Sequence, residues 1–287
     1  MADHTTSAPA KTFALGGDLT VNRMGYGAMR ITGDGIWGPP QDHAESIRVL
    51  QRAVELGINF IDTADSYGPN VSEELIAEAL HPYASGLIIG TKGGLLRTGP
   101  NQWPIDSSPE HLKEALEGSL QRLKLDKIDL YQLHRVDPNV PFEKTLEFLQ
   151  QAQEDGLIKH IGLSEVTVEQ IQQAQQYVKV VSVQNMYSVD NRKWEAELEF
   201  CEQNGLAFIP WYPLAGGNEQ ALSKLTQIGE KHGVSKQQVA LSWLLHRSPN
   251  ILLIPGTSKV KHLEENVKAA DVQLSAEDMA ELDNFGS

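Results

Sequence analysis

The stretch Leu56-Gly57-Ile58-Asn59-Phe60-Ile61-Asp62 ends an amphipathic segment at a glycine and opens a short run of apolar and β-branched residues. Glycine is favoured at such a junction because the residue after a helix often takes a left-handed conformation. The same punctuation recurs at Gly156 and Gly205, where a helical segment again gives way to a strand-like run. This alternation is typical of βα units arranged around a parallel sheet.

Followed in both directions, the alternation predicts eight strands separated by amphipathic helices. The predicted strands are Gly25–Met29, Ile58–Asp62, Leu87–Lys92, Ile128–His134, His160–Ser164, Val180–Asn185, Ala207–Trp211 and Ile251–Pro255. The predicted helices are Ala44–Leu56, Ser72–Leu80, Pro109–Leu123, Phe142–Glu154, Val168–Gln176, Lys193–Gln203 and Ser235–Leu245. Ser108 and Ser235 stand at helix starts as capping side chains, the former followed by a proline that suits the first helical turn.

Eight strands with right-handed crossovers close most simply into an α/β fold, the (β/α)8 TIM barrel. An open doubly wound sheet would usually show a glycine-rich phosphate turn after its first strand. The segment Gly25-Tyr26-Gly27-Ala28-Met29 has only two glycines in that frame and no helix start, which favours tight strand packing. We expect Phe13–Val21, with its Gly-Gly-Asp turn, to form a hairpin that caps the barrel, and Leu274–Phe285 to form an extra C-terminal helix.

The composition is that of one globular domain. An apolar fraction of 40% and a charged fraction of 22% in 287 residues predict a single barrel over residues 13–287, after a disordered tail at residues 1–12. The start of the chain lacks a basic and apolar leader, and no run reaches the roughly 18 apolar residues of a membrane helix. We therefore expect a cytoplasmic protein, monomeric or weakly self-associating.

Charge and cysteine content exclude several classes of partner. A net charge of -14 repels nucleic acids and anionic membranes, so neither is an expected partner. The single Cys201 excludes an internal disulfide and argues against a structural zinc site built from thiolates, and we expect it to be a small buried or half-buried helix residue.

Ionisable residues gather where three neighbouring strands end. Asp62 ends the second strand with Tyr67 just beyond, Lys92 ends the third, and His134 ends the fourth. Strand ends in a barrel face one pocket. A phenol can protonate a carbonyl oxygen during hydride transfer if an ammonium such as Lys92 lowers its pKa, with Asp62 as the counter-ion. His134 would orient the oxygen, although each of these residues taken alone is more often a capping, packing or surface residue.

These residues stand in motifs that resemble the aldo-keto reductase family, in order along nearly the whole chain. The motifs are Phe13-Ala14-Leu15-Gly16-Gly17, Gly25-Tyr26-Gly27-Ala28-Met29, Asn59-Phe60-Ile61-Asp62-Thr63-Ala64-Asp65-Ser66-Tyr67-Gly68, Thr91-Lys92 and Asp129-Leu130-Tyr131-Gln132-Leu133-His134. The resemblance implies a (β/α)8 barrel that binds NADP(H) without a Rossmann domain and transfers its pro-R hydride. It also implies catalysis by Asp62, Tyr67, Lys92 and His134.

The resemblance further implies a set of cofactor-binding residues. Ser164 and Gln184 match side chains that bind the nicotinamide carboxamide, whereas Glu165 replaces the usual Asn and either accepts from that amide or points away. Trp211 matches the ring that stacks on the nicotinamide, with core packing as the alternative. The pyrophosphate loop is matched by Leu214 and Gly216, and the adenosine end by Thr257, Ser258, Lys259, His262, Glu265 and Asn266.

The adenosine end departs from the family pattern in two positions. Gly256 and His262 stand where many relatives have Lys and Arg, so affinity for the 2′-phosphate depends more on Lys259 and neighbouring hydroxyls. We still expect NADP(H) rather than NAD, because Lys259 precedes a helix whose N-terminus favours anions.

Substrate choice is expected in three loops, at residues 30–42, 95–107 and 135–141. Met29, Trp37, Trp103 and Arg135 are the candidate pocket residues, although these loops could simply pack on one another. The resemblance extends to a bacterial branch with pyridoxal reductases, so the predicted substrate is a small carbonyl compound such as pyridoxal or another aromatic aldehyde. A regulatory or redox-sensing NADP(H)-binding barrel with little turnover is the alternative. A metal-dependent lyase or hydrolase is disfavoured because His134 has no second imidazole at a neighbouring strand end, so no metal is expected.

Overall fold

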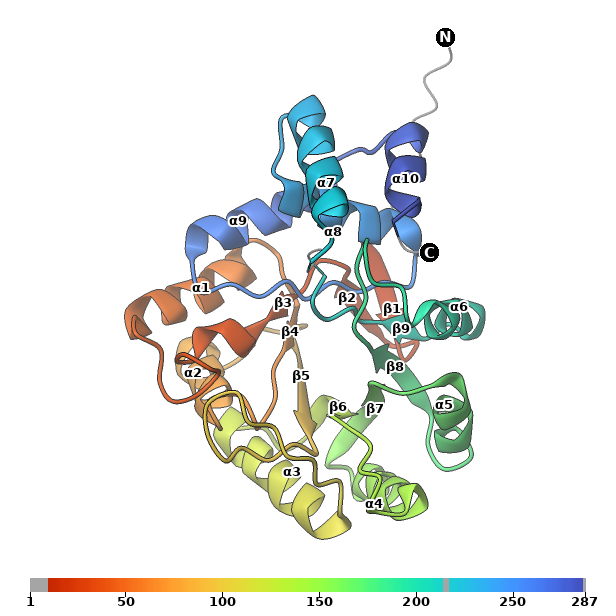
Figure 1. Cartoon of the computed structure of the whole chain (residues 1–287). Helices are drawn as coiled ribbons and strands as arrows, with labels where there is room; N and C mark the ends of the chain where they lie inside the picture. Colours follow the sequence, from red (N-terminus) through yellow and green to blue (C-terminus); the bar gives the residue numbers. More distant parts are fainter. Residues whose placement is uncertain (1–9, 214–216, 286–287) are drawn as a thin grey trace.

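The structure is a computed structural model, described here over residues 10–213 and 217–285. A parallel sheet curls through the centre of the molecule, and a ring of helices surrounds it (Figure 1). Its strands pair in chain order. They are β3 (Tyr26–Gly27), β4 (Phe60–Asp62), β5 (Ile88–Gly93), β6 (Ile128–Leu133), β7 (Ile158–Ser164), β8 (Val180–Gln184) and β9 (Ala207–Phe208).

The eighth predicted strand is present only as an extended segment with isolated bridges. Ile251 bridges Phe208 on one side, and Leu253 bridges Met24 on the other, so the segment still joins the two edges of the sheet and closes the barrel. A side chain at Gly25 or Gly27 would meet the carbonyl oxygen of Leu253 or Ile254, which confirms the prediction of tight strand packing. A further bridge joins Gly256 to Gly27, on the far side of Pro255, which itself has no backbone N–H to donate.

Helices form the outer layer of the part of the chain that the structure describes. They are α1 (His43–Glu55), α2 (Val71–Leu80), α3 (Pro109–Leu123), α4 (Phe142–Glu154), α5 (Val168–Ala174), α6 (Glu195–Asn204), α7 (Glu219–His232), α8 (Lys236–Arg247), α9 (Val260–Lys268) and α10 (Ala276–Asp283), with 3-10 turns η1 (Ala28–Ile31) and η2 (Ala269–Asp271). The predicted caps Ser108 and Ser235 accept hydrogen bonds from the third residue of their helices. Cys201 is buried in α6, as expected.

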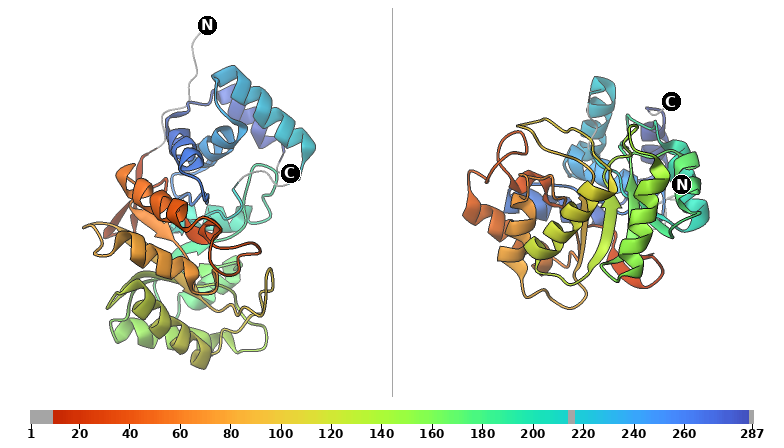
Figure 2. Two further views of the ribbon diagram at one scale, coloured as in Figure 1. Left: turned by 90° about the vertical axis from the view of Figure 1, so that its left-hand side faces the viewer. Right: turned by 90° about the horizontal axis from the view of Figure 1, so that it is seen from below.

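Helix α7 was not among the predicted helices. It packs on α8 and α10 and stands apart from the strands, beside the extra C-terminal helix (Figure 2). Its signals are nonetheless present, since Asn218 caps its start and Gly233 ends it in a left-handed conformation. Ala221, Leu225 and Ile228 form its buried face. Within the described ranges, no helix is long and apolar enough to cross a membrane.

The predicted hairpin closes one end of the barrel. It consists of β1 (Thr12–Leu15) and β2 (Leu19–Asn22), which pair antiparallel. Leu15 and Val21 are fully buried and belong to one apolar cluster with Phe60 and Ile88, which begin β4 and β5. The amino-terminal end of the barrel is therefore sealed by apolar side chains, and the opposite end is left for the polar residues.

Candidate active site

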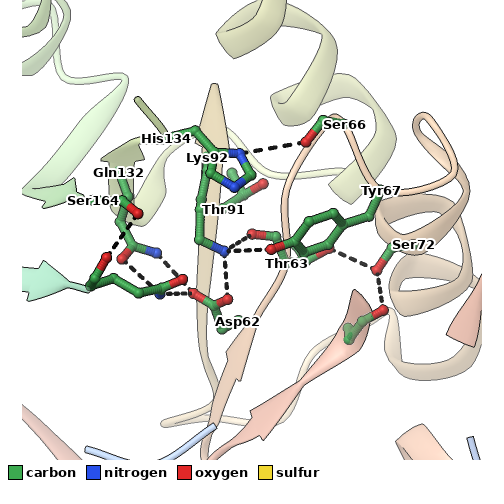
Figure 3. A network of polar contacts seen from close by, with 12 residues as sticks. Asp62, Thr63, Ser66, Tyr67, Ser72, Thr91, Lys92, Gln132, His134 and Ser164 are labelled. Carbon is green, nitrogen blue, oxygen red and sulfur yellow. Dashed lines mark hydrogen bonds and ion pairs between the residues drawn. The ribbon is translucent and has the colours of Figure 1, made fainter. Parts of the chain in front are cut away.

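The four candidate catalytic residues converge at the carboxyl-terminal ends of the strands (Figure 3). The Lys92 Nζ atom lies 2.5 Å from Asp62 Oδ1 and 3.4 Å from the Tyr67 hydroxyl oxygen, and it donates a third hydrogen bond to the Thr63 carbonyl at 2.8 Å. Lys92 and Asp62 are 0% and 2% exposed, so this ion pair is removed from water. The phenol, the ammonium and its counter-ion therefore form one contact chain.

Asp62 is held by amides as well as by the ammonium. Its Oδ2 atom accepts hydrogen bonds from Gln132 Nε2 at 2.8 Å and from Gln184 Nε2 at 3.0 Å. Buried carboxylates are costly unless their lone pairs are satisfied. Gln132 was missed as a site residue, although it lies two positions before His134 and so shares the inward face of β6.

The loop after β4 fixes the position of Tyr67. Its backbone is tied to β5, since Thr63 N donates to the Gly90 carbonyl and Asp65 N donates to the Lys92 carbonyl. At the start of α2, the Ser72 hydroxyl bonds the Ala28 carbonyl and the Thr63 hydroxyl. The phenol is thus presented to Lys92 by a loop anchored on both sides.

The predicted lowering of the Tyr67 pKa is wrong for this structure. Burial raises the pKa of the phenol, and the nearby Lys92 ammonium offsets only part of that rise. Burial also disfavours the ammonium of Lys92, but Asp62 and Tyr67 outweigh this effect, and the pKa of Lys92 lies above its usual value. Tyr67 therefore keeps its proton at neutral pH beside a charged Lys92, which is the state that a proton donor needs.

His134 is a neutral imidazole beside the phenol. Burial lowers its pKa well below the usual value, and the positive charges of Lys92 and Arg135 add to the effect. Its ring meets the Tyr67 ring edge-on at 5.8 Å between centroids, and its Nδ1 atom lies 3.4 Å from the Ser66 hydroxyl. If that hydroxyl donates to Nδ1, the imidazole carries its hydrogen on Nε2 and can donate it to an oxygen.

A cavity of about 750 Å³ opens over these residues, and many of the predicted binding residues line it. Ser164, Gln184, Trp211 and Asn266 line it together with the candidate catalytic residues Asp62, Tyr67 and His134. Ser164 is held in place, because its hydroxyl donates to the Gln184 carbonyl and accepts from Arg135. The residues assigned to the nicotinamide and to catalysis therefore share one space.

Of the two orientations expected for Glu165, the structure has the one in which the carboxylate points away from the cavity. Its backbone is left-handed, and its Oε1 atom accepts hydrogen bonds from the Trp211 indole Nε1 and the Met186 backbone N–H, both at 2.7 Å. Glu165 is absent from the described lining of the cavity, in which Trp211 takes part. It thus acts on the site through the orientation of Trp211.

The adenosine-end residues lie around a second cavity of about 660 Å³, lined by Thr257, Ser258 and Lys259. The expected anion-binding helix start is partly occupied, because the Val260 N–H of α9 donates to the Glu45 carboxylate of α1. That hydrogen bond lowers the pKa of Glu45.

Two further predicted residues fall outside this lining. His262 is exposed on α9, and Glu265 is half-buried there, and neither lines the cavities over the part of the chain described. Leu214 and Gly216 lie outside the described residues.

The substrate candidates divide into two groups. Met29, Trp103 and Arg135 line the larger cavity, joined by Leu95 and Ile105. Trp37 does not line it, because its ring stacks against the Arg97 guanidinium at the surface, and Ile36 lines the cavity instead.

Over the described ranges, no cluster of three or more His, Cys, Asp or Glu side chains is arranged to hold a metal ion.

Comparisons with known protein sequences and with solved structures indicate the same family. Residues 23–286 match the model of the aldo/keto reductase family. The chain is 57% identical to an uncharacterised oxidoreductase of Schizosaccharomyces pombe over 94% of this chain and 88% of the relative. It is 43% identical to pyridoxine 4-dehydrogenase of Escherichia coli over 96% of this chain and 98% of the relative.

A solved structure of similar fold is an aldo/keto reductase from Klebsiella pneumoniae in complex with NADP and acetate. Its TM-score is 0.82 at 25% identity, over 96% of both chains. The barrel and its polar strand ends define an oxidoreductase scaffold, and the chain belongs to the aldo/keto reductase family. The predicted TIM-barrel fold is confirmed.

Proposed function

We propose that the protein reduces an aldehyde or ketone to an alcohol with NADPH, and that Tyr67 supplies the proton. The observation that carries the proposal is the contact chain from Asp62 through Lys92 to Tyr67 at the floor of the larger cavity. A buried ammonium held 3.4 Å from a phenol stabilises the phenolate that remains once the proton has left.

The two cavities fit an extended dinucleotide. They share Arg30, Ile36 and Gly256, so one track runs from Tyr67 to Lys259. Trp211 offers a flat face in the larger cavity, and Ser164 offers a hydroxyl there. Arg30 and Lys259 bring two cations to the smaller cavity, which Asp34 and Asp42 also line; these carboxylates accept hydrogen bonds from the Gln41 amide and from the Glu45 N–H at the start of α1. The two cations support NADP(H) over NAD(H).

Each of these residues has a separate role in the proposed reduction. NADPH, when bound, supplies the hydride that reaches the carbonyl carbon. The Tyr67 hydroxyl gives its proton to the carbonyl oxygen, and the bond between that proton and the phenol breaks as the alcohol O–H forms. Lys92 stabilises the phenolate, Asp62 keeps Lys92 charged and in place, and the phenolate regains a proton from solvent. His134 orients the carbonyl oxygen by donating a hydrogen bond.

Pyridoxal is the substrate we propose to test first, because the relative at 43% identity is a pyridoxine 4-dehydrogenase. The assay follows NADPH absorbance with pyridoxal and with 4-nitrobenzaldehyde as a general aromatic aldehyde. Repeated turnovers with either compound support the proposal. Binding of NADPH without turnover of any aldehyde in a broad panel would favour the regulatory or redox-sensing barrel instead.

We further propose that the protein acts in the cytoplasm as one domain, monomeric or weakly associated, and that it binds neither nucleic acid nor membranes. One contiguous apolar cluster reaches from Met24 to Leu282, which supports a single domain. The acidic balance of the chain supports the absence of anionic partners. Light scattering after size-exclusion chromatography measures the oligomeric state.

A further inference from the structure

One arginine in the larger cavity has a fixed position but an incomplete set of partners. Arg135 follows β6 directly after His134 and is half-buried in the cavity lining. Its Nη1 atom donates to the His134 carbonyl at 2.6 Å and to the Ser164 hydroxyl at 3.1 Å, and its guanidinium lies 5.8 Å from the centroid of the Trp211 ring. The planar group is therefore oriented before any ligand arrives.

The remaining donors of Arg135 are open to the cavity. Its Nε and Nη2 atoms have no hydrogen-bond acceptor among the described residues, and they are not among the polar atoms shielded from solvent without a partner. No carboxylate of the described chain forms an ion pair with Arg135. Glu165, the carboxylate whose charge acts on Arg135, instead accepts hydrogen bonds from Trp211 and Met186. A cation with free donors in a cavity of largely apolar walls is a ready site for an anion.

Two other arginines near the site, Arg97 and Arg122, are engaged in structural contacts. The Arg97 guanidinium lies against the Trp103 ring, at 3.7 Å from the ring centroid, and donates to five backbone carbonyls, those of Gly35, Ile36, Ser66, Gly99 and Gln102. Arg122 pairs with the buried Glu73 at 2.7 Å. Arg30 is exposed and lies where the two cavities meet, which places it on the side we assign to the cofactor phosphates. Arg135 is thus distinguished by position and by its unused N–H groups.

We infer that Arg135 is a specificity residue that binds an anionic oxygen substituent of the substrate, which makes aromatic aldehydes carrying a carboxylate or phenolate the preferred class. The inference rests on the proposed function. Trp103, Ile105 and Leu95 supply apolar walls for a ring, and Arg135 stands beside the imidazole that orients the reacting carbonyl. Consecutive residues place the two groups close together, so the charged substituent belongs near the aldehyde on the same ring. Pyridoxal, with a phenolic oxygen next to its aldehyde, falls in this class.

The test compares two substrates that differ in one charge. With NADPH, kcat/KM is measured for 3-carboxybenzaldehyde and for its neutral methyl ester, methyl 3-formylbenzoate. We expect the wild-type protein to favour the acid by about tenfold or more, mainly through KM, because a charge-assisted pair is lost with the ester. Arg135→Met should collapse that ratio towards one, and Arg135→Lys should give an intermediate ratio, because an ammonium lacks the planar fork.

Arg97→Lys is the matched control, since it alters a second arginine near the cavity whose hydrogen-bond partners are backbone carbonyls. It should leave the ratio of acid to ester as in the wild type, whatever it does to stability. Equal kcat/KM for acid and ester in the wild type would overturn the inference. So would an Arg135→Met variant in which both substrates lose equally while calorimetry shows weaker NADPH binding, because Arg135 would then serve the cofactor.

A binding measurement separates this inference from the proposed function. Isophthalate carries the carboxylate but no aldehyde, so its affinity for the protein with NADP⁺ present can be measured by calorimetry without turnover. We expect Arg135→Met to weaken it by about tenfold or more. If isophthalate binding depends on Arg135 while no aldehyde is reduced, the proposed reaction fails and the anion site stands. If aldehydes are reduced but isophthalate binding does not depend on Arg135, only the inference of an anion site is wrong.

Discussion

The two ends of the barrel are built from the same strands but contain opposite kinds of side chain. At the carboxyl-terminal end, Asp62, Lys92 and His134 bring ionisable groups into a buried space. At the amino-terminal end, Leu15 of the hairpin packs with Phe60 and the other buried apolar residues of its cluster. Burying charge opposes folding, whereas burying apolar surface favours it. The comparison indicates that the carboxyl-terminal end supplies the candidate site, whereas the amino-terminal end stabilises the fold.

The largest effect is expected where the polar end loses its cation. Lys92→Met should lower kcat by about 10²–10⁴-fold and should also destabilise the fold by about 3–5 kcal/mol, because Asp62 is left buried and unpaired. The double variant Asp62→Asn/Lys92→Met should recover stability without recovering activity. Urea unfolding and NADPH-dependent kinetics measure the two effects. Full activity in the double variant would remove the ion pair from the mechanism.

The apolar end should show the reverse pattern. Leu15→Ala should reduce the free energy of unfolding by about 2–5 kcal/mol, because the side chain is fully buried in the cluster that the hairpin seals. It should leave kcat and KM near their wild-type values at a temperature where the variant is folded. The half-buried Leu19, on the same hairpin, is the control, and Leu19→Ala should cost less. A large loss of kcat in folded Leu15→Ala would contradict the prediction that the amino-terminal end affects stability and not activity.

A buried carboxyl behind the polar end offers a pH test. Burial, together with the charge of Glu73, raises the pKa of Asp65 to about 8, and its Oδ1 atom has no hydrogen-bond partner among the described residues. Below pH 4 the folded and unfolded states both hold the proton. Between pH 4 and 8 only the folded state holds it, so stability falls as the pH rises through this window.

Asp65→Asn removes this titration. It should stabilise the protein on the order of 2 kcal/mol at pH 7 and should gain little at pH 4, which denaturant titrations at both pH values can measure. An equal gain at both values would mean that ionisation of Asp65 does not oppose folding.

The smallest effect concerns the orientation of Trp211. Glu165→Ala should weaken NADPH binding by about 1 kcal/mol, roughly fivefold, because the indole loses its acceptor. Glu165→Gln should bind NADPH nearly as the wild type, since an amide oxygen can accept the same hydrogen bonds. Calorimetry with NADPH compares the two variants. Equal losses in both would show that the negative charge itself matters.

The parts predictable from sequence were those set by local pattern. Gly57, Gly156 and Gly205 all have positive φ, as their place after helices predicted, and the candidate catalytic residues lie at one end of the barrel (Figure 3) because parallel strands share a direction. The eighth strand was predicted to be continuous but has only isolated bridges, since its pairing depends on how closely Gly25 and Gly27 approach it from a distant part of the chain.

Features that depend on three-dimensional packing were not predictable in this way. The direction of the Tyr67 pKa is set by burial, which a loop sequence does not reveal. The contact from Glu165 to Trp211 depends on a left-handed backbone at a residue that seldom adopts one. Similarly, the Glu45 carboxylate reaches the start of α9 from a helix more than two hundred positions earlier in the chain.

The most direct test is the Tyr67→Phe variant, which keeps the aromatic ring and removes only the proton donor. We predict that kcat for aldehyde reduction falls by about 10²–10⁴-fold, while NADPH affinity measured by calorimetry and the melting temperature stay close to the wild type. Turnover of the folded variant within about threefold of the wild type would contradict the account, because the proton would then come from another group.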